Sequence, residues 1–184
     1  MQPYRNNRQG GAGMNRKLIA VRLRAMEPED LDLLYRIEND KSLWGVGVTN
    51  VPYSRYTLHD YIANTVGDIY TDKQVRLIVE NEQGESVGLI DITNFDPRHL
   101  RAELGVVIQS KFRGKGYATS AIHEIIEYAS DILHLHQLYI YVDSDNIVSK
   151  NMFQKIGFTC SIELKDWLFD GKEYRNAWLM QYFL

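Results

Sequence analysis

Residues 102–121 read AELGVVIQSKFRGKGYATSA, an apolar run followed by a basic stretch with two glycines and an amphipathic segment. The apolar run predicts a strand, and the residues after Gly116 predict a helix. In such an arrangement, the free N–H groups and the dipole of the helix N-terminus bind an anion. Gly114 and Gly116 let the backbone approach a phosphate without a Cβ in the way, and Arg113 and Lys115 add positive charge. The stretch is therefore either a phosphate-binding turn or a solvated basic turn.

Two familiar phosphate-binding motifs do not fit this stretch. A P-loop needs G-x-x-x-x-G-K-[ST], which the chain lacks. A Rossmann fingerprint needs a third glycine after Gly114 and Gly116, where Thr119 stands. A phosphate at this turn is therefore bound in some other way.

Periodic patterns predict the elements on both sides of the turn. Downstream they predict a helix over 116–133, a strand over 137–144, a helix over 148–158 that Gly157 stops, and two strands, 159–169 and 173–183, around the Asp170-Gly171 turn. Upstream they predict a strand over 18–26, a helix over 27–40 that starts near Pro28, a loop over 41–56, a helix over 57–66, a hairpin over 74–95 around Gly84, and a strand over 101–110. The order is β-α-α-β-β-β-α-β-α-β-β.

This order predicts an α/β (α+β) fold in a single domain over 18–184, with helices flanking a mixed, mostly antiparallel sheet. A length of 184 residues suits one domain with a sizeable core. Residues 1–17 are polar and Gly-rich, which predicts a flexible leader, and Met14 is an alternative natural start.

Composition narrows the class of protein. The net charge of −3 argues against a nucleic-acid partner, because phosphate-binding surfaces concentrate Lys and Arg. Cys160 is the only cysteine, so no internal disulfide or thiolate zinc cluster can form, and we expect no metal site. No apolar run reaches the roughly 18 residues of a membrane span, and the N-terminus lacks a signal-peptide core. We therefore expect a cytoplasmic protein without a membrane partner.

A second motif follows some thirty residues after the glycine turn. Residues 145–158 read DNIVSKNMFQKIGF and contain N-x-x-[AS]-x-x-x-[YF]-x-x-x-G-F. Together the two stretches resemble the acetyl-CoA site of the GCN5-related N-acetyltransferase (GNAT) superfamily. In that superfamily an [RQ]-x-x-G-x-[GA] loop holds the pyrophosphate through backbone N–H groups, the strand before it bonds the pantetheine, and the Asn-containing segment lines the other side. Lys111 replaces the usual Arg or Gln, a mild departure because the contact there is mostly from backbone.

The resemblance implies acetyl-CoA as cosubstrate and assigns its contacts position by position. Pantetheine would lie against Val106, Val107 and Ile108. The pyrophosphate would be held by Arg113, Gly114, Lys115, Gly116, Tyr117 and Ala118. The other side of the cleft would be lined by Asn146, Ser149 and Phe153.

Acetyl transfer to an amine needs a group that takes the amine's proton and one that protonates the leaving thiolate. Glu103 is the first candidate for the base and Asp91 the second, and the alternative for each is a strand-edge carboxylate paired with Arg or solvent. Many relatives carry a Tyr proton donor where this chain has Phe153. Tyr141 or Tyr139 could substitute through water, or the thiolate could leave unassisted.

The acceptor amine is predicted from resemblance within the superfamily. The ending LFDGKEYRNAWLM and the block RAELGVVIQSKFRGKGYAT look most like spermidine N-acetyltransferases and ribosomal-protein alanine N-acetyltransferases. We expect a primary amine, first a polyamine such as spermidine, whose charge would be matched by Glu38, Asp40, Asp91, Glu103 and Glu163. The alternatives are a protein N-terminus, an aminoglycoside-like amine, or a catalytically silent acyl-CoA binding module.

Two features bear on assembly and regulation. The polyamine enzymes carry an acidic segment where this chain has VTNVPYSRY, at residues 48–56. Exposed strand edges in such folds often pair, so a homo-oligomer is possible.

Overall fold

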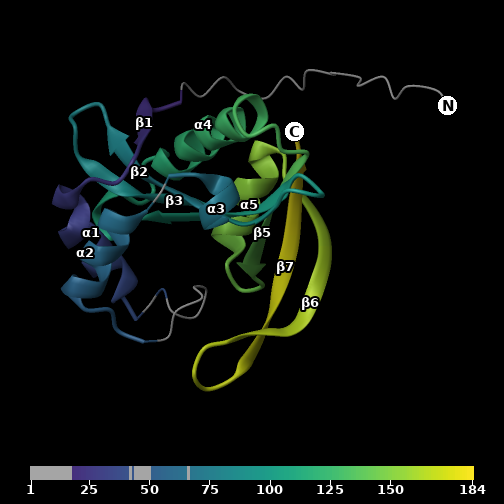
Figure 1. Ribbon diagram of the computed structural model, residues 1–184. Coiled ribbons are helices and arrows are strands. Elements are labelled where there is room, and N and C mark those ends of the chain that lie inside the picture. Colours follow the sequence, from purple (N-terminus) through teal and green to yellow (C-terminus); the bar gives the residue numbers. More distant parts are fainter. Residues whose placement is uncertain (1–17, 42, 44–50, 66) are drawn as a thin grey trace.

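One sheet of seven strands runs through the computed structural model, in the order β1-β2-β3-β4-β5-β7-β6 (Figure 1). The strands are β1 (Val21–Arg24), β2 (Val75–Asn81), β3 (Ser86–Asp96), β4 (Arg101–Ile108), β5 (Gln137–Asp143), β6 (Thr159–Phe169) and β7 (Tyr174–Phe183). All neighbouring strands are antiparallel except β4 and β5, which are parallel. The structure describes residues 18–41, 43, 51–65 and 67–184, so the predicted leader over 1–17 and much of the predicted loop lie outside it.

Helices cover both faces of the sheet (Figure 1). They are α1 (Leu31–Glu38), α2 (Arg55–Asn64), α3 (Ile69–Asp72), α4 (Tyr117–Asp131) and α5 (Ile147–Ile156), with short 3-10 helices at Pro28–Asp30 and Ser110–Phe112. Leu34 of α1 and Leu58 of α2 pack in one core with Leu89 of β3. Ile122 of α4 packs with Ile90 of β3 in the larger core on the opposite face. Successive residues of β3 thus face different helix layers, as the two-residue period of a strand requires.

The predicted element order and fold class are confirmed, with one addition. The short helix α3 was not predicted, because four residues are too few for a periodic pattern. Its start is capped by Asp68, whose carboxylate accepts hydrogen bonds from the N–H groups of Tyr70 and Thr71. The helix predicted over 57–66 begins earlier, at Arg55, because Ser54 caps it by accepting from Thr57 N–H at 3.0 Å.

The predicted C-terminal hairpin forms β6 and β7, with Gly171 at a φ of +96° in the turn. β7 pairs with β5 on one side and β6 on the other, so β6 becomes an edge of the sheet. The turn of the hairpin projects beyond the helices (Figure 1, yellow). The last strand of the chain, β7, is thus inserted between β5 and β6.

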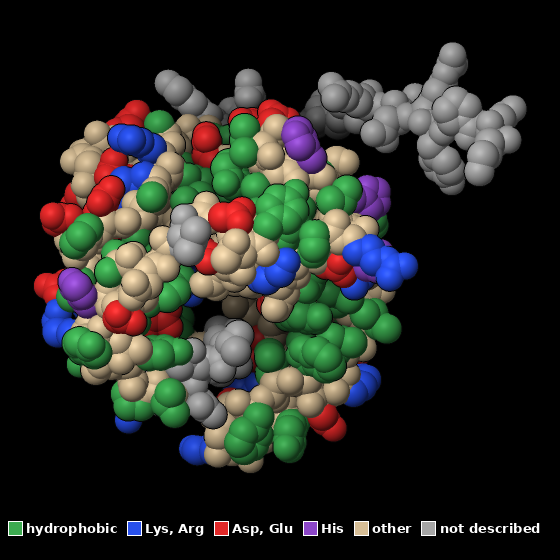
Figure 2. Space-filling model, in the orientation of Figure 1, with side chains coloured by type: hydrophobic (Ala, Val, Ile, Leu, Met, Phe, Trp, Pro, Cys, Tyr) green, Lys and Arg blue, Asp and Glu red, His purple; other side chains and the backbone are tan. Residues whose placement is uncertain are grey.

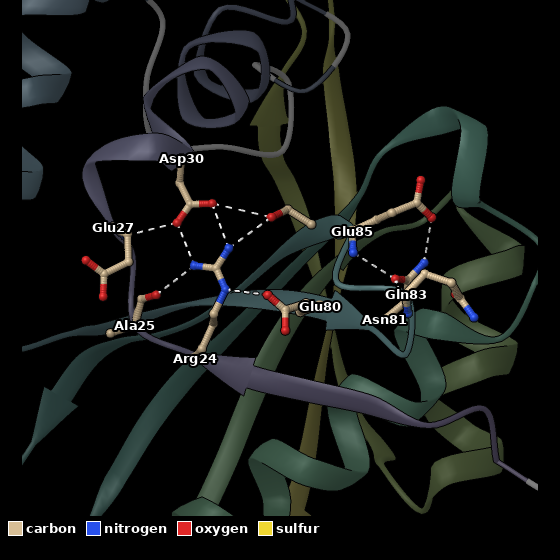
Figure 3. Close-up of polar contacts among 9 residues, drawn as sticks. Arg24, Ala25, Glu27, Asp30, Glu80, Asn81, Gln83 and Glu85 are labelled. Carbon is tan, nitrogen blue, oxygen red and sulfur yellow. Dashed lines mark hydrogen bonds and ion pairs between the residues drawn. The ribbon is translucent and has the colours of Figure 1, made fainter.

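The edge strand β1 is joined to the rest of the fold by a polar cluster around Arg24 (Figure 3). Its guanidinium donates to both carboxylate oxygens of Asp30, at 2.6 and 2.9 Å, and to Glu80 of β2 at 2.8 Å. Asp30 also accepts from the Glu27 N–H at 2.9 Å, at the start of the 3-10 helix. Burial alone would raise the pKa of Asp30, but the hydrogen bonds from Arg24 and Glu27 outweigh it and hold that pKa below its ordinary value.

Candidate active site

The centre of the sheet opens between its two parallel strands. β4 and β5 pair only at Arg101 with Gln137, Ala102 with Leu138, and Glu103 with Tyr139. Beyond that point β4 still pairs with β3, and β5 with β7, but β4 and β5 no longer pair with each other. Backbone N–H and C=O groups along this gap are therefore available to a ligand. The gap runs along Val106, Val107 and Ile108, the predicted pantetheine strand.

The glycine turn follows the C-terminal end of β4, at the end of the gap that is far from Glu103. Gly114 and Gly116 have φ of +72° and +97°, the left-handed region that favours glycine. A Cβ added at Gly114 would meet no atom within 4 Å, so the turn faces open space. Arg113 Nε donates to the Ile108 carbonyl at 2.9 Å and fixes the turn against the strand.

Helix α4 begins immediately after the turn, at Tyr117, and its first-turn N–H groups have no partner within the helix. The ammonium groups of Lys111 and Lys115 lie 4.6 and 5.5 Å from the centre of the Phe112 ring. The backbone donors, the helix dipole and the lysines together form a cradle for an anion. The positive charge, the backbone donors and the open space at Gly114 are compatible with the predicted pyrophosphate.

The second motif forms the start of α5, beyond the end of β5. Asn146 is the N-cap, and its Oδ1 accepts from the Ser149 N–H at 3.1 Å. The Asn-x-x-Ser spacing therefore has a structural role in capping. Phe153 is buried, with its ring centre 5.1 Å from that of Phe158, so the segment also contributes to the core.

Glu103 lies where the gap begins. Its Oε2 accepts a hydrogen bond from Asn94 Nδ2 at 2.8 Å. Tyr139 lies opposite on β5, and Tyr141, two residues further, shares its face beside the gap. Burial and the charge of Glu103 raise the pKa of Tyr139 to about 12 and also raise that of Tyr141. Both phenols therefore keep their protons at neutral pH.

Asp91 has a different environment. Arg76 contacts both of its oxygens, at 2.9 and 3.0 Å, and also donates to Glu38 at 2.6 Å. The alternative considered for this residue, a carboxylate paired with arginine, is what the structure shows. Because both Asp91 oxygens are engaged, the geometry favours Glu103 as the base.

A cleft of about 460 Å³ leads to Glu103 from the side of α1 and α2. Its lining comes from Glu38, Tyr53, Thr57, Leu58, Tyr61, Asp72, Lys73, Gln74, Arg76, Thr93 and Asn94. Glu103 does not line the cleft but lies next to two residues that do. Thr93 pairs with Glu103 in register, and Asn94 donates a hydrogen bond to it. Figure 2 shows this face hollowed near its centre, between the half with α1 and α2 and the half with the β6–β7 hairpin.

Glu163 lies apart from these carboxylates. Glu163 pairs in register with Trp178 of β7, and the Lys150 ammonium of α5 lies 3.8 Å from the centre of the Trp178 ring. Tyr141, which shares the face of Glu103, pairs instead with Leu179, the next residue of β7. Since neighbouring strand residues face opposite sides, Glu163 faces α5, away from Glu103. Glu163 therefore does not lie with the carboxylates near Glu103, and its predicted part in matching the charge of a polyamine stays a prediction.

Two residues of the site were not predicted. Arg76 organises two of the acidic side chains, but an arginine in a strand carries no local signal of its partners. Asn94 could have been noticed, because Asn is depleted in strands and enriched where φ is positive.

In the described part of the chain, every helix is too short or too polar to cross a membrane. The same residues contain no group of three His, Cys, Asp or Glu side chains that could hold a metal ion.

Comparison with known proteins gives consistent results. The model of the family described as "Acetyltransferase (GNAT) domain" matches residues 20–159. The spermidine N(1)-acetyltransferase of Escherichia coli K12 is 32% identical over 159 residues, which cover 86% of this chain and 83% of the relative. The fold matches spermidine N-acetyltransferase from Vibrio cholerae in complex with CoA and spermine, with a TM-score of 0.81, 24% identity and coverage of 89% and 95%. A dodecameric structure of the Vibrio cholerae enzyme matches with a TM-score of 0.76, 25% identity and coverage of 89% and 93%.

Proposed function

Because the chain belongs to the GNAT family of N-acetyltransferases, we propose that it transfers an acetyl group from acetyl-CoA to a primary amine of a polyamine such as spermidine. The predicted family and the N-acetyltransferase activity are confirmed by the family match. The observation that carries the proposal is the gap between β4 and β5, which ends at the glycine turn and opens beside Glu103.

The binding of acetyl-CoA is assigned to the residues around this gap. The backbone of Val106, Val107 and Ile108 would hold the pantetheine. The pyrophosphate would be bound by Arg113, Gly114, Lys115, Gly116, Tyr117 and Ala118, and the far wall formed by Asn146, Ser149 and Phe153. When bound, acetyl-CoA supplies the acetyl group as a reactive thioester. The open space at Gly114 and the backbone groups along the gap support this assignment.

Proton transfer is assigned to two side chains at the mouth of the gap. Glu103 takes the proton of the acceptor amine, directly or through water, while Asn94 occupies its other oxygen. Tyr141 is the proton donor on the opposite strand, because it lies beside the gap and remains protonated at neutral pH. Phe153 has no hydroxyl and cannot take that role. Asp91, the second candidate for the base, is engaged by Arg76.

The proposal of a polyamine rests on the relatives and on the character of the cleft. A curated relative at 32% identity is a spermidine N(1)-acetyltransferase. Lys73 and Arg76 balance Glu38 and Asp72 in the lining of the cleft, so the negative charge that would attract a cation is that of Glu103, next to Asn94. Outside the lining of this cleft, on the β5 side of the gap, the rings of Tyr141 and Trp167 lie 5.6 Å apart and offer aromatic surface that suits an alkylammonium chain.

Location and assembly are proposed on similar grounds. We place the enzyme in the cytoplasm, as its single cysteine suggests. We also propose that copies of the chain assemble, since a relative is dodecameric and β6 forms an exposed sheet edge.

The test is release of free CoA from acetyl-CoA with a panel of amines: spermidine, spermine, peptides with free N-termini, and an aminoglycoside. We expect the fastest release with a polyamine, and Glu103→Gln should slow turnover about 100-fold or more without changing acetyl-CoA affinity. Faster release with a peptide or an aminoglycoside would contradict the polyamine assignment.

A further inference from the structure

We propose that Asn94 is a positioning residue for this reaction, whose side-chain amide holds the Glu103 carboxylate so that one oxygen faces the acceptor amine. The inference rests on the proposed function, in which Glu103 is the base. The contact that carries it is the hydrogen bond of 2.8 Å from Asn94 Nδ2 to Glu103 Oε2. Among the described residues, no hydrogen bond to Glu103 Oε1 is found, so this second oxygen is left for the substrate.

The backbone is distorted to make this contact. Asn94 has a φ of +51° and lies where the register of β3 against β4 shifts, between Thr93 and Asp96. This conformation costs a residue with a side chain about 1 kcal/mol, although Asn tolerates it better than most. Such strained positions are often found at functional sites.

The bulge decides which side of the sheet Asn94 faces. In a regular strand, Ile92 and Asn94 would share a face, yet Ile92 and Phe95 are the two that share the buried core. The extra residue therefore shifts the alternation by one position. Phe95 takes the core position, and Asn94 lines the acceptor cleft, next to Glu103.

Among the described residues, the other polar groups near Glu103 make no hydrogen bond to its carboxylate, so Asn94 alone restrains it there. Tyr139 and Tyr141 face it from β5, and the ion pair between Arg101 and Asp96, at 3.2 Å, lies at the end of its own strand. Across the cleft, Arg76 is engaged by carboxylates. A glutamate side chain has several rotamers, and the amide of Asn94 restrains which of them the carboxylate adopts.

A double-mutant cycle separates positioning from a purely structural role. Asn94→Gly removes the amide, and glycine suits the positive φ. The substitution is measured alone and in a Glu103→Gln background, with kcat for the best amine of the panel and the dissociation constant of acetyl-CoA as readouts. The matched control is His134→Gly, which makes the same change at a φ of +51° between α4 and β5.

If Asn94 acts through Glu103, Asn94→Gly lowers kcat about tenfold, part of what a positioned base supplies, and leaves acetyl-CoA affinity unchanged. In the Glu103→Gln background it adds less than about a twofold loss, and His134→Gly has no effect in either background. An equal loss in both backgrounds, or no loss in either, overturns the proposal. Should Asn94→Gly not fold, Asn94→Ala also removes the amide and adds no charge beside Glu103, so it serves in the same cycle.

Failure of the proposed function gives a different result. A wild-type enzyme that acetylates a peptide but no polyamine contradicts the polyamine assignment, while the cycle measured on that peptide still reports on Asn94. Wild-type enzyme that releases no CoA with any amine contradicts both.

Discussion

At the scale of single residues, the hydrogen-bond partners of two carboxylates, Asp30 and Glu103, indicate different roles. Glu103 accepts the Asn94 hydrogen bond at one oxygen, which leaves the other for its proposed role as base, whereas both oxygens of Asp30 accept hydrogen bonds from Arg24. The side chain of Asp30 is only 6% exposed, and that of Arg24 is 21% exposed. Asp30 therefore belongs to the stability of the fold: it joins the first 3-10 helix to Arg24 of β1, which in turn donates to Glu80 of β2.

We expect Asp30→Asn to lower the free energy of unfolding by about 2 kcal/mol at pH 7, because it leaves a partly buried arginine without its main partner. Since the pKa of Asp30 is depressed in the folded state, its stabilisation is complete above the ordinary aspartate pKa of about 3.9 and is lost as the pH falls through the folded value. Urea unfolding at pH 7, 5 and 3 measures the difference between wild type and variant.

The control is Asp32→Asn, which removes an exposed ion pair with Arg55 and should leave the free energy of unfolding nearly unchanged. A wild-type advantage over Asp30→Asn that stays constant from pH 7 to pH 3 would contradict the assigned role of the Asp30 charge.

Some residues of the candidate site could be predicted from local sequence patterns, and others could not. Glu103 could be named from the sequence because it lies near the start of a recognisable strand that leads into the glycine turn. Asn94 is noticeable only as an asparagine inside a strand; its contact with Glu103 depends on a bulge, which is set by the residues of β3 that reach the core and has no local pattern. The pairing of Asp91 with Arg76 was foreseen only as a general alternative, since the two residues are 15 positions apart.

At the scale of elements, the glycine turn before α4 was the strongest local signal, and its φ angles explain why. Gly114, at +72°, and Gly84, at +75° in the turn between β2 and β3, have the same backbone conformation, and an added Cβ meets no atom within 4 Å at either position. Gly84 is therefore a matched control for Gly114, because only Gly114 lies at the proposed pyrophosphate site.

We expect Gly114→Ala and Gly84→Ala to lose similar stability, about 1 kcal/mol each, from the strained φ. Only Gly114→Ala should weaken acetyl-CoA binding, by about tenfold or more, because the methyl group and the altered backbone obstruct the anion cradle. Isothermal titration calorimetry with acetyl-CoA and urea unfolding measure the two effects. Equal cofactor affinity in the two variants would argue against the assigned pyrophosphate site.

Most elements could be predicted because their signals are local. Asp170-Gly171 marked the last hairpin, and apolar periodicity marked α4. The strand order could not be predicted in the same way. That β7 lies between β5 and β6 depends on long-range pairing, such as Tyr141 with Leu179, which no local pattern encodes.

At the scale of the whole molecule, the position of β7 makes β6 a sheet edge and carries its hairpin beyond the body of the fold (Figure 1). Large apolar side chains are exposed there: Trp167 is 53% exposed, Phe169 54% and Tyr174 65%. Phe169 and Tyr174 pair in register, with ring centres 5.0 Å apart. A cluster of exposed aromatic residues on an edge hairpin is typical of an interface.

We therefore expect the wild-type protein to be larger in solution than its chain mass of 21.4 kDa, and Phe169→Ser/Tyr174→Ser to shift it toward smaller species. The substitutions remove apolar surface that an interface between copies would bury, and burial of such surface contributes about 25 cal/mol of free energy per Å². The control, Tyr56→Ser, removes a ring that is 81% exposed on α2 and should leave the mass unchanged. Sedimentation velocity over a range of concentrations measures the species present. A monomeric wild type would refute assembly, and a double variant that assembles like the wild type would place the interface elsewhere.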